Sequence, residues 1–266
     1  MYRLFDITHK LAQYVEQDFP RLAHDSQSAY IMLLKTVLHS VNQASFTEVE
    51  SNFWLRDMIA DIKKLVNEVN DLARLGPSVG ELLSKAMDSV SLKMRNKGAS
   101  YVVLCDCLSL TEFLYLIYVF RGNVRPDEAL CAVNPSGKTG TFKYLARYYL
   151  GAEEVPDFLV MSAVAEGIKN KFDCSGHYLF PEIDHFVHKT WDNGFETFED
   201  LSDGLFSLVN KLAVKIRDLR PASTLILADH GYDTLNESGK WSLTHKWDAR
   251  FSLLSPIVPI LLVGGR

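Results

Sequence analysis

The sequence has few cysteines, and none of them forms a paired motif. The chain contains no Cys-x-x-Cys spacing; its cysteines are Cys105, Cys107, Cys131 and Cys174. Three of them lie in or beside apolar runs, where a cysteine usually packs as a small buried side chain. The pattern therefore predicts free thiols in a reducing cytoplasm rather than a disulfide framework.

Clustered positive charge is also missing. Lysine and arginine number 28 against 33 acidic residues, for a formal net charge of −5. Proteins that bind nucleic acid through the phosphate backbone need clustered lysine and arginine. We therefore expect no dedicated nucleic-acid-binding patch. A phosphate-containing substrate still fits this composition, because bound metal ions can supply the positive charge.

Long apolar runs are absent as well. The longest, around 113–120 and 257–263, are too short to span a bilayer, and the start MYRLFDITHK has no apolar core of a signal peptide. We expect a cytoplasmic protein with no membrane partner. With 47% apolar and 23% charged residues, the chain has an ordinary globular composition that predicts a sizeable core.

Residues 1–98 predict a helical region. Thr47 and Glu50 have the spacing of a capping box. Apolar residues then recur at steps of four and three, as one helix face requires, at Met58, Ile62, Leu65, Val69 and Leu72. We interpret this region as a helical bundle or packing module that could bind a protein partner.

Residues 99–266 show a different pattern, in which short apolar runs alternate with amphipathic segments. This alternation predicts an α/β fold with a buried, largely parallel sheet flanked by helices. The predicted strands are 101–105, 129–133, 157–163, 223–228 and 257–263. The predicted helices are 109–121, 139–150 and 199–218. Ser109 and Glu112 have capping-box spacing at the head of one helix, and 174–177 is interpreted as a loop turn.

Polar residues follow three of the predicted strands. Asp106 comes directly after the first, the stretch AVNPSGKTGTF covers the end of the second, and Asp229-His230-Gly231 follows the fourth. In open α/β sheets, ligands bind beyond the carboxyl ends of the strands. We therefore expect an acid, a hydroxyl and an Asp-His pair to meet at one edge of the sheet.

Two further groups supply metal-ligand side chains. Asp184 and His188 are four residues apart, which places them on one side of a helix or a compact turn, and His245 precedes the last strand. Mixed carboxylate and imidazole ligands suit divalent ions, zinc first and manganese next. The candidate ligands for two such ions are Asp106, Asp184, His188, Asp229, His230 and His245.

The stretch Ala132–Thr139 also fits a relaxed Walker A loop, because it follows an apolar strand and precedes a predicted helix. An alanine replaces the first glycine, and Pro135 removes one amide that could bind phosphate. A P-loop NTPase is thus an alternative function, although it gives no role to the histidines of the other strand ends.

The order of these residues resembles the metal-binding series of the alkaline phosphatase superfamily. Asp106, a hydroxyl near 139, Asp184-x-x-x-His188, Asp229-His230-Gly231 and His245 follow that series over about residues 100–266. Among its branches the chain is most similar to the PglZ domain, in the strand ending "ADHG" and in the nucleophile loop that "NPSGKTGTF" resembles. One departure is that no basic residue follows Asp106 in Asp106-Cys107-Leu108-Ser109.

The resemblance implies a metal-dependent phosphoester hydrolase, with a diester favoured over a monoester and a nucleotide or oligonucleotide among the possible substrates. It implies that Thr139 is the nucleophile, with Ser136 as second and Thr141 as third choice, and that Lys138 offsets charge on the phosphoryl oxygens. One ion would lie with Asp106, Asp229 and His230, and the other with Asp184, His188 and His245. The missing basic residue keeps a non-catalytic, phosphatase-like binding module as a further alternative.

Overall fold

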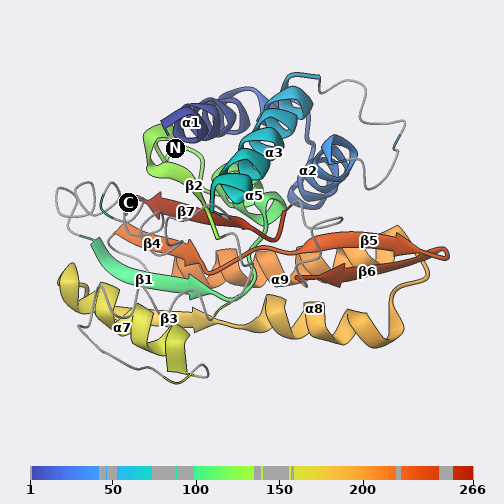
Figure 1. Cartoon of the computed structure of the whole chain (residues 1–266). Coiled ribbons are helices and arrows are strands. Elements are labelled where there is room, and N and C mark those ends of the chain that lie inside the picture. The colour runs from blue at the N-terminus through green and yellow to red at the C-terminus, as the bar shows by residue number, and fades with distance from the viewer. Residues whose placement is uncertain are drawn as a thin grey trace.

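A computed structural model describes most of the chain. The described residues are 2–41, 46, 53–73, 88, 99–134, 139, 156, 159–219, 223–245 and 254–265. They form a five-stranded sheet, a separate two-stranded sheet and helices on both faces of the larger sheet (Figure 1). The predicted α/β class is confirmed.

The larger sheet is mixed rather than largely parallel. Its strands, in spatial order, are β2 (Ala129–Val133), β7 (Ile257–Val263), β4 (Ser223–Ala228), β1 (Ala99–Cys105) and β3 (Gly176–Phe180). β1 is parallel to both β3 and β4, whereas β7 is antiparallel to both β2 and β4. The apolar run of β7 is buried at every position, and such a run carries no information about strand direction.

Four of the five predicted strands of this sheet are confirmed, at 101–105, 129–133, 223–228 and 257–263. The prediction of a strand at 157–163 is wrong, because helix α7 (Val160–Lys171) begins there. Val160, Val164 and Ile168 are buried at steps of four, so the apolar run belongs to one helix face.

Three strands were not predicted. β3 begins at Gly176, so the interpretation of 174–177 as a loop turn is wrong for Gly176 and His177. β3 is only half-buried over most of its length, and β5 (Asp233–Glu237) and β6 (Lys240–Thr244) form a hairpin rich in polar residues. None of the three has the apolar run on which the prediction depended.

The predicted helices at 109–121 and 199–218 are confirmed as α5 (Leu110–Val119) and α9 (Phe198–Asp218). Ser109 and Glu112 form the predicted capping box at the start of α5. The structure adds α8 (Glu182–Asn193), which begins just after β3. Apart from Thr139, the predicted helix at 139–150 lies outside the described residues.

The described part of residues 1–98 is helical. It contains α1 (Tyr2–Gln17), the 3-10 turn η1 (Phe19–Arg21), α2 (Ser26–Ser40) and α3 (Phe53–Ala73). Met58, Ile62 and Leu65 of the predicted α3 face are buried. Thr47, Glu50 and the side chains of Val69 and Leu72 lie outside what the structure describes.

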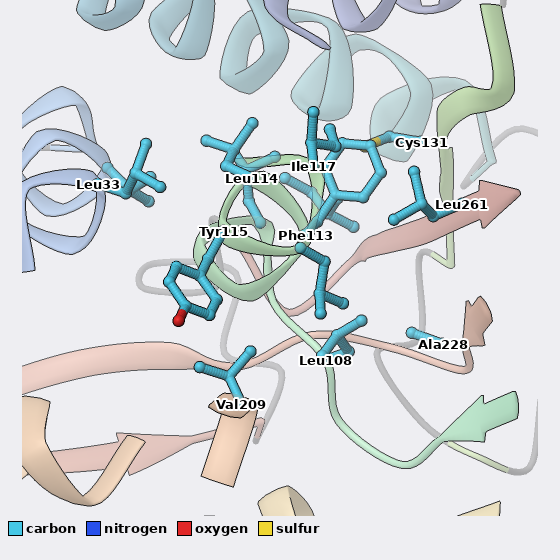
Figure 2. Close-up of a cluster of buried hydrophobic side chains, with 14 of the residues drawn as sticks. Leu33, Leu108, Phe113, Leu114, Tyr115, Ile117, Cys131, Val209, Ala228 and Leu261 are labelled. Carbon is cyan, nitrogen blue, oxygen red and sulfur yellow. The ribbon is translucent and has the colours of Figure 1, made fainter. Parts of the chain in front are cut away.

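These helices pack on the same face of the sheet as α5, while α7 covers the other face (Figure 1). Leu33 of α2, Phe113 of α5 and Leu261 of β7 lie in one continuous hydrophobic cluster (Figure 2). A further 3-10 turn, η3 (Pro126–Glu128), precedes β2 and packs against α1. No helix among the described residues has the length and apolar character needed to cross a membrane.

Candidate metal centre

The parallel pairing of β1 and β4 brings their polar ends together. Cys105 pairs with Ala228 as the last residue of each strand, so Asp106 and Asp229 follow at the same edge of the sheet. β3 also ends there, and α8 starts directly after it with Asp184 in its first turn. The predicted meeting of strand-end residues is therefore what the structure shows.

Asp106, Asp229 and His230, the first group, have ligand atoms within 4.8 Å of one another. His230 Nε2 lies 3.3 Å from Asp229 Oδ2 and 3.7 Å from Asp106 Oδ1. Asp229 and His230 are fully buried, and Asp106 is partly buried. Two carboxylates and an imidazole thus point to one small volume.

Asp184, His188 and His245, the second group, are closer still. The two Nε2 atoms are 3.3 Å apart, and Asp184 Oδ1 lies 3.4 Å from that of His188 and 3.2 Å from that of His245. Donors at about 2.1 Å from a tetrahedral zinc ion are about 3.4 Å from one another. The second group therefore has the spacing of three corners of such a tetrahedron.

Thr190 fixes the position of His245 relative to α8. Its Oγ1 accepts a hydrogen bond from the Leu243 backbone amide at 3.0 Å, which ties α8 to β6 just before His245. A backbone bridge between Phe195 and Trp241 holds the other end of β6. The hairpin of β5 and β6 is therefore held beside α8 at both ends of β6. No sequence motif predicts these contacts.

The two groups are adjacent. The rings of His230 and His245 have centroids 4.8 Å apart, which links one group to the other. Trp191 packs against both imidazoles of the second group, with centroids 4.3 Å from His188 and 5.3 Å from His245. The two groups therefore form one composite site of six carboxylate and imidazole side chains.

Two details indicate that these residues suit a cation. Asp106 Oδ1 is buried and has no hydrogen-bond partner, a costly state for a carboxylate unless a ligand satisfies it. His230 Nδ1 lies 2.9 Å from the Gly231 carbonyl, so this nitrogen donates and leaves the Nε2 lone pair facing the carboxylates. Both groups could therefore bind a divalent metal, and their oxygen and nitrogen donors suit zinc.

The electrostatics of the first group favour the uncharged carboxyl in the absence of metal. Burial, followed by repulsion from Asp229 and Asp184, raises the pKa of Asp106 from 3.8 to about 8. Burial likewise raises the pKa of Asp229 to about 7, against hydrogen bonds that lower it. Burial alone would raise the pKa of Asp184. The hydrogen bond from His245 and the charges of the neighbouring imidazoles outweigh burial, so the pKa of Asp184 is lowered.

These shifts predict how the stability of the metal-free chain depends on pH. The folded pKa values of Asp106 and Asp229 exceed the unfolded value of about 3.9. Their favourable contribution is therefore complete below about pH 4 and is lost as pH rises through about 7 to 8. With chelator, the melting temperature should fall by several degrees between about pH 6 and pH 9. Saturating Zn²⁺ should remove this fall. If the melting temperature falls equally with pH with and without Zn²⁺, the assignment of Asp106 and Asp229 as metal ligands is contradicted.

Thr139 is the described hydroxyl of the predicted nucleophile loop. Its Oγ1 donates a hydrogen bond to Asp229 Oδ2 at 2.8 Å, which places it beside the first group. Asn134, the residue directly after β2, donates from Nδ2 to the Asp229 carbonyl oxygen at 2.8 Å and so links the end of β2 to the end of β4. The other predicted loop residues, Ser136, Lys138 and Thr141, lie outside the described residues.

Cys107 and Gly231 shape the two loops of the first group and were not predicted as site residues. Cys107 has φ 70°, a left-handed conformation that costs free energy for a residue with a side chain. This turn lets its amide donate to Asp229 Oδ1 at 3.1 Å. At Gly231, an added Cβ would lie 2.7 Å from the Leu254 carbonyl oxygen, so the loop needs glycine for close backbone approach.

Substituting Gly231 with alanine should therefore displace the loop that carries Asp229 and His230. We expect a loss of about 2 kcal/mol or more in unfolding free energy, together with weaker metal binding, because backbone must move. Gly204→Ala is the matched control: its Cβ would meet the ring tip of Phe186, a side chain that can shift. Chemical denaturation of both variants tests this, and equal losses would show that backbone approach at Gly231 is unimportant.

No protein-family model matches the sequence, and no curated protein matches it.

Proposed function

We propose that the chain is a metal-dependent phosphoester hydrolase that acts through Thr139 and two divalent ions. The observation that carries this proposal is the meeting of a hydroxyl with two Asp/His groups at one sheet edge. Thr139 Oγ1 is 2.8 Å from Asp229, and the rings of His230 and His245 connect the groups at 4.8 Å. The resemblance to the PglZ branch of the alkaline phosphatase superfamily supports the same chemistry.

The residues of the chain have distinct roles in this reaction. Asp106, Asp229 and His230 would hold one ion and Asp184, His188 and His245 the other, with zinc preferred and manganese as the alternative. When bound, divalent ions lower the pKa of a hydroxyl or water and stabilise charge on phosphoryl oxygens. Thr139 Oγ1 donates a hydrogen bond to Asp229 Oδ2. The lone pairs of the Thr139 oxygen therefore point away from the carboxylate.

Catalysis would proceed in two displacements. Thr139 Oγ1 would attack phosphorus as the bond to the leaving alcohol breaks, and the Thr139 proton would end on the departing alkoxide, which leaves as the alcohol. The intermediate is a phosphothreonine that, for a diester substrate, keeps the second ester group. A water molecule then attacks the same phosphorus, the bond to Thr139 breaks, and the hydroxyl is restored. Lys138, directly before Thr139, is proposed to offset charge on the phosphoryl oxygens.

The resemblance to the PglZ branch favours a diester substrate, which carries one negative charge, over a monoester. Three carboxylates would balance three of the four positive charges of two divalent ions, and Lys138 is proposed to add one positive charge beside the phosphoryl group.

The test is hydrolysis of a chromogenic phosphodiester beside the matching phosphomonoester, with and without chelator. We expect chelator to abolish turnover, Zn²⁺ or Mn²⁺ to restore it, and the diester to be the better substrate. Full metal occupancy without turnover of either ester would refute the enzyme proposal and favour the non-catalytic binding module.

The P-loop NTPase is the second candidate, because the Thr139–Asp229 hydrogen bond also suits a hydroxyl and an acid that hold a magnesium nucleotide. It uses neither Asp184 nor the histidines of the two groups. ATP binding that is lost in Lys138→Ala, in a protein that binds no zinc, would favour it over the phosphoesterase.

A further inference from the structure

A buried carboxylate outside the two metal groups joins three parts of the chain. Glu112, in the first turn of α5, is fully buried. Its Oε1 accepts hydrogen bonds from the hydroxyls of Tyr30 at 2.5 Å and Tyr232 at 2.6 Å. Its Oε2 accepts from Ser109, through the backbone amide at 3.1 Å and the side-chain hydroxyl at 2.5 Å.

These four donors satisfy the acceptor positions of an ionised carboxylate. The first turn of a helix also favours negative charge. Burial, followed by the charge of Glu112, raises the pKa of Tyr30 well above 10, so this hydroxyl is protonated and donates. The network is therefore complete, and the removal of a single donor leaves a buried oxygen of Glu112 with one hydrogen bond instead of two.

The partners of Glu112 lie next to the first group. Ser109 ends the short loop that begins at Asp106, and Tyr232 comes two residues after His230. Tyr30 lies on α2, in the N-terminal helical region. Glu112 thus links the Asp106 loop to the Asp229–His230 loop through hydrogen bonds from Ser109 and Tyr232. The hydrogen bond from Tyr30 connects α2 to the same carboxylate.

We propose that Glu112 is a positioning residue that sets the spacing of Asp106 from Asp229 and His230, with Tyr30 making the N-terminal helical region part of the metal-site scaffold. This inference rests on the proposed metal binding by the first group. It assigns α2, through Tyr30, a role in shaping the site.

A role in stability alone explains these residues less well. A buried carboxylate contributes little net stability compared with an apolar side chain of similar volume. The surrounding core is apolar, and Tyr115 lies within it (Figure 2). Tyr115 packs edge-on against Tyr30, with ring centroids 5.5 Å apart. Apolar packing alone does not fix the distance between the Asp106 loop and the Asp229–His230 loop. The four hydrogen bonds of the Glu112 carboxylate do so, because each has a defined donor and direction.

The test compares two neighbouring tyrosines, each of which loses only its hydroxyl. Tyr30→Phe removes a bond to Glu112, whereas Tyr115→Phe removes a hydroxyl that makes none of the four described bonds to Glu112. Both are made in a His188→Ala parent, in which the first group is the remaining site. Co²⁺ affinity is measured by competition with a chelator, together with the visible absorption spectrum of the bound ion and the unfolding of the metal-free chain.

We expect Tyr30→Phe to weaken Co²⁺ binding about tenfold and to change the cobalt spectrum, as loss of an outer hydrogen bond does at other metal sites. Tyr115→Phe should leave affinity and spectrum unchanged even where it lowers the melting temperature to a similar extent. Unchanged affinity in Tyr30→Phe, or equal weakening in both variants, overturns the inference and leaves the proposed function standing. A His188→Ala parent that binds no Co²⁺ overturns the inference, and a wild-type chain that binds none overturns the proposed function as well. The expected cobalt result, together with a metal-loaded wild-type chain that hydrolyses no ester, overturns the enzyme function alone.

Discussion

Replacing Thr139 with alanine is expected to lower kcat for phosphodiester hydrolysis by about 10³-fold or more, because no hydroxyl remains to attack phosphorus. The first group should still bind its ion, since its carboxylates and imidazole are unchanged. Asp229 loses the hydrogen bond that Thr139 donates at 2.8 Å, so the affinity for that ion should change only modestly. Steady-state kinetics and elemental analysis on the same preparation measure both effects.

Thr139→Ser is the matched control for this prediction. It keeps a hydroxyl at the same position and should retain far more activity than the alanine variant. Wild-type turnover in Thr139→Ala would exclude Thr139 as the nucleophile. The remaining candidates would then be Ser136 and Thr141, the second and third choices from the sequence.

Replacing Asp229 with asparagine should remove the ion of the first group and reduce hydrolysis below detection. Asp229 Oδ1 accepts backbone bonds from Cys107 at 3.1 Å and His230 at 2.8 Å, and an asparagine oxygen can keep both. The variant is therefore expected to lose metal binding and hydrolysis because the side chain loses its charge and becomes a weaker ligand, while the fold is kept. Asparagine also removes a buried charge, so the metal-free variant should be more stable than the metal-free wild type at about pH 8.

This opposite effect on stability and function distinguishes a binding residue from a structural one. Asp184→Asn is the control variant: it should lose the ion of the second group and retain that of the first. Both ions bound with wild-type affinity in Asp229→Asn would refute the ligand assignment.

The sequence predicted the fold where apolar periodicity is strong and failed where it is not. β1, β2, β4 and β7 have continuous apolar runs, and all were predicted. The half-buried β3 and the polar hairpin of β5 and β6 have none. A run such as 157–163 fits a buried strand or a helix face equally well, and only the following residues at steps of four make it helical.

The candidate site was more predictable than the sheet, because its residues come directly after strands or one helical turn apart. Asp106 and Asp229 are brought level by the pairing of Cys105 with Ala228, and the four-residue step from Asp184 to His188 falls on α8. The supports of the site depend on tertiary contacts between distant segments. The amide of Cys107, the hydrogen bond at Thr190 and the partners of Glu112 have no local pattern that could reveal them.

The metal content of the purified chain tests the central claim most directly. After saturation with Zn²⁺ and removal of free ion, elemental analysis should give about two ions per chain, the number that two adjacent Asp/His groups predict. One should be missing in Asp229→Asn and the other in Asp184→Asn. A wild-type chain that retains neither zinc nor manganese under these conditions would contradict the account.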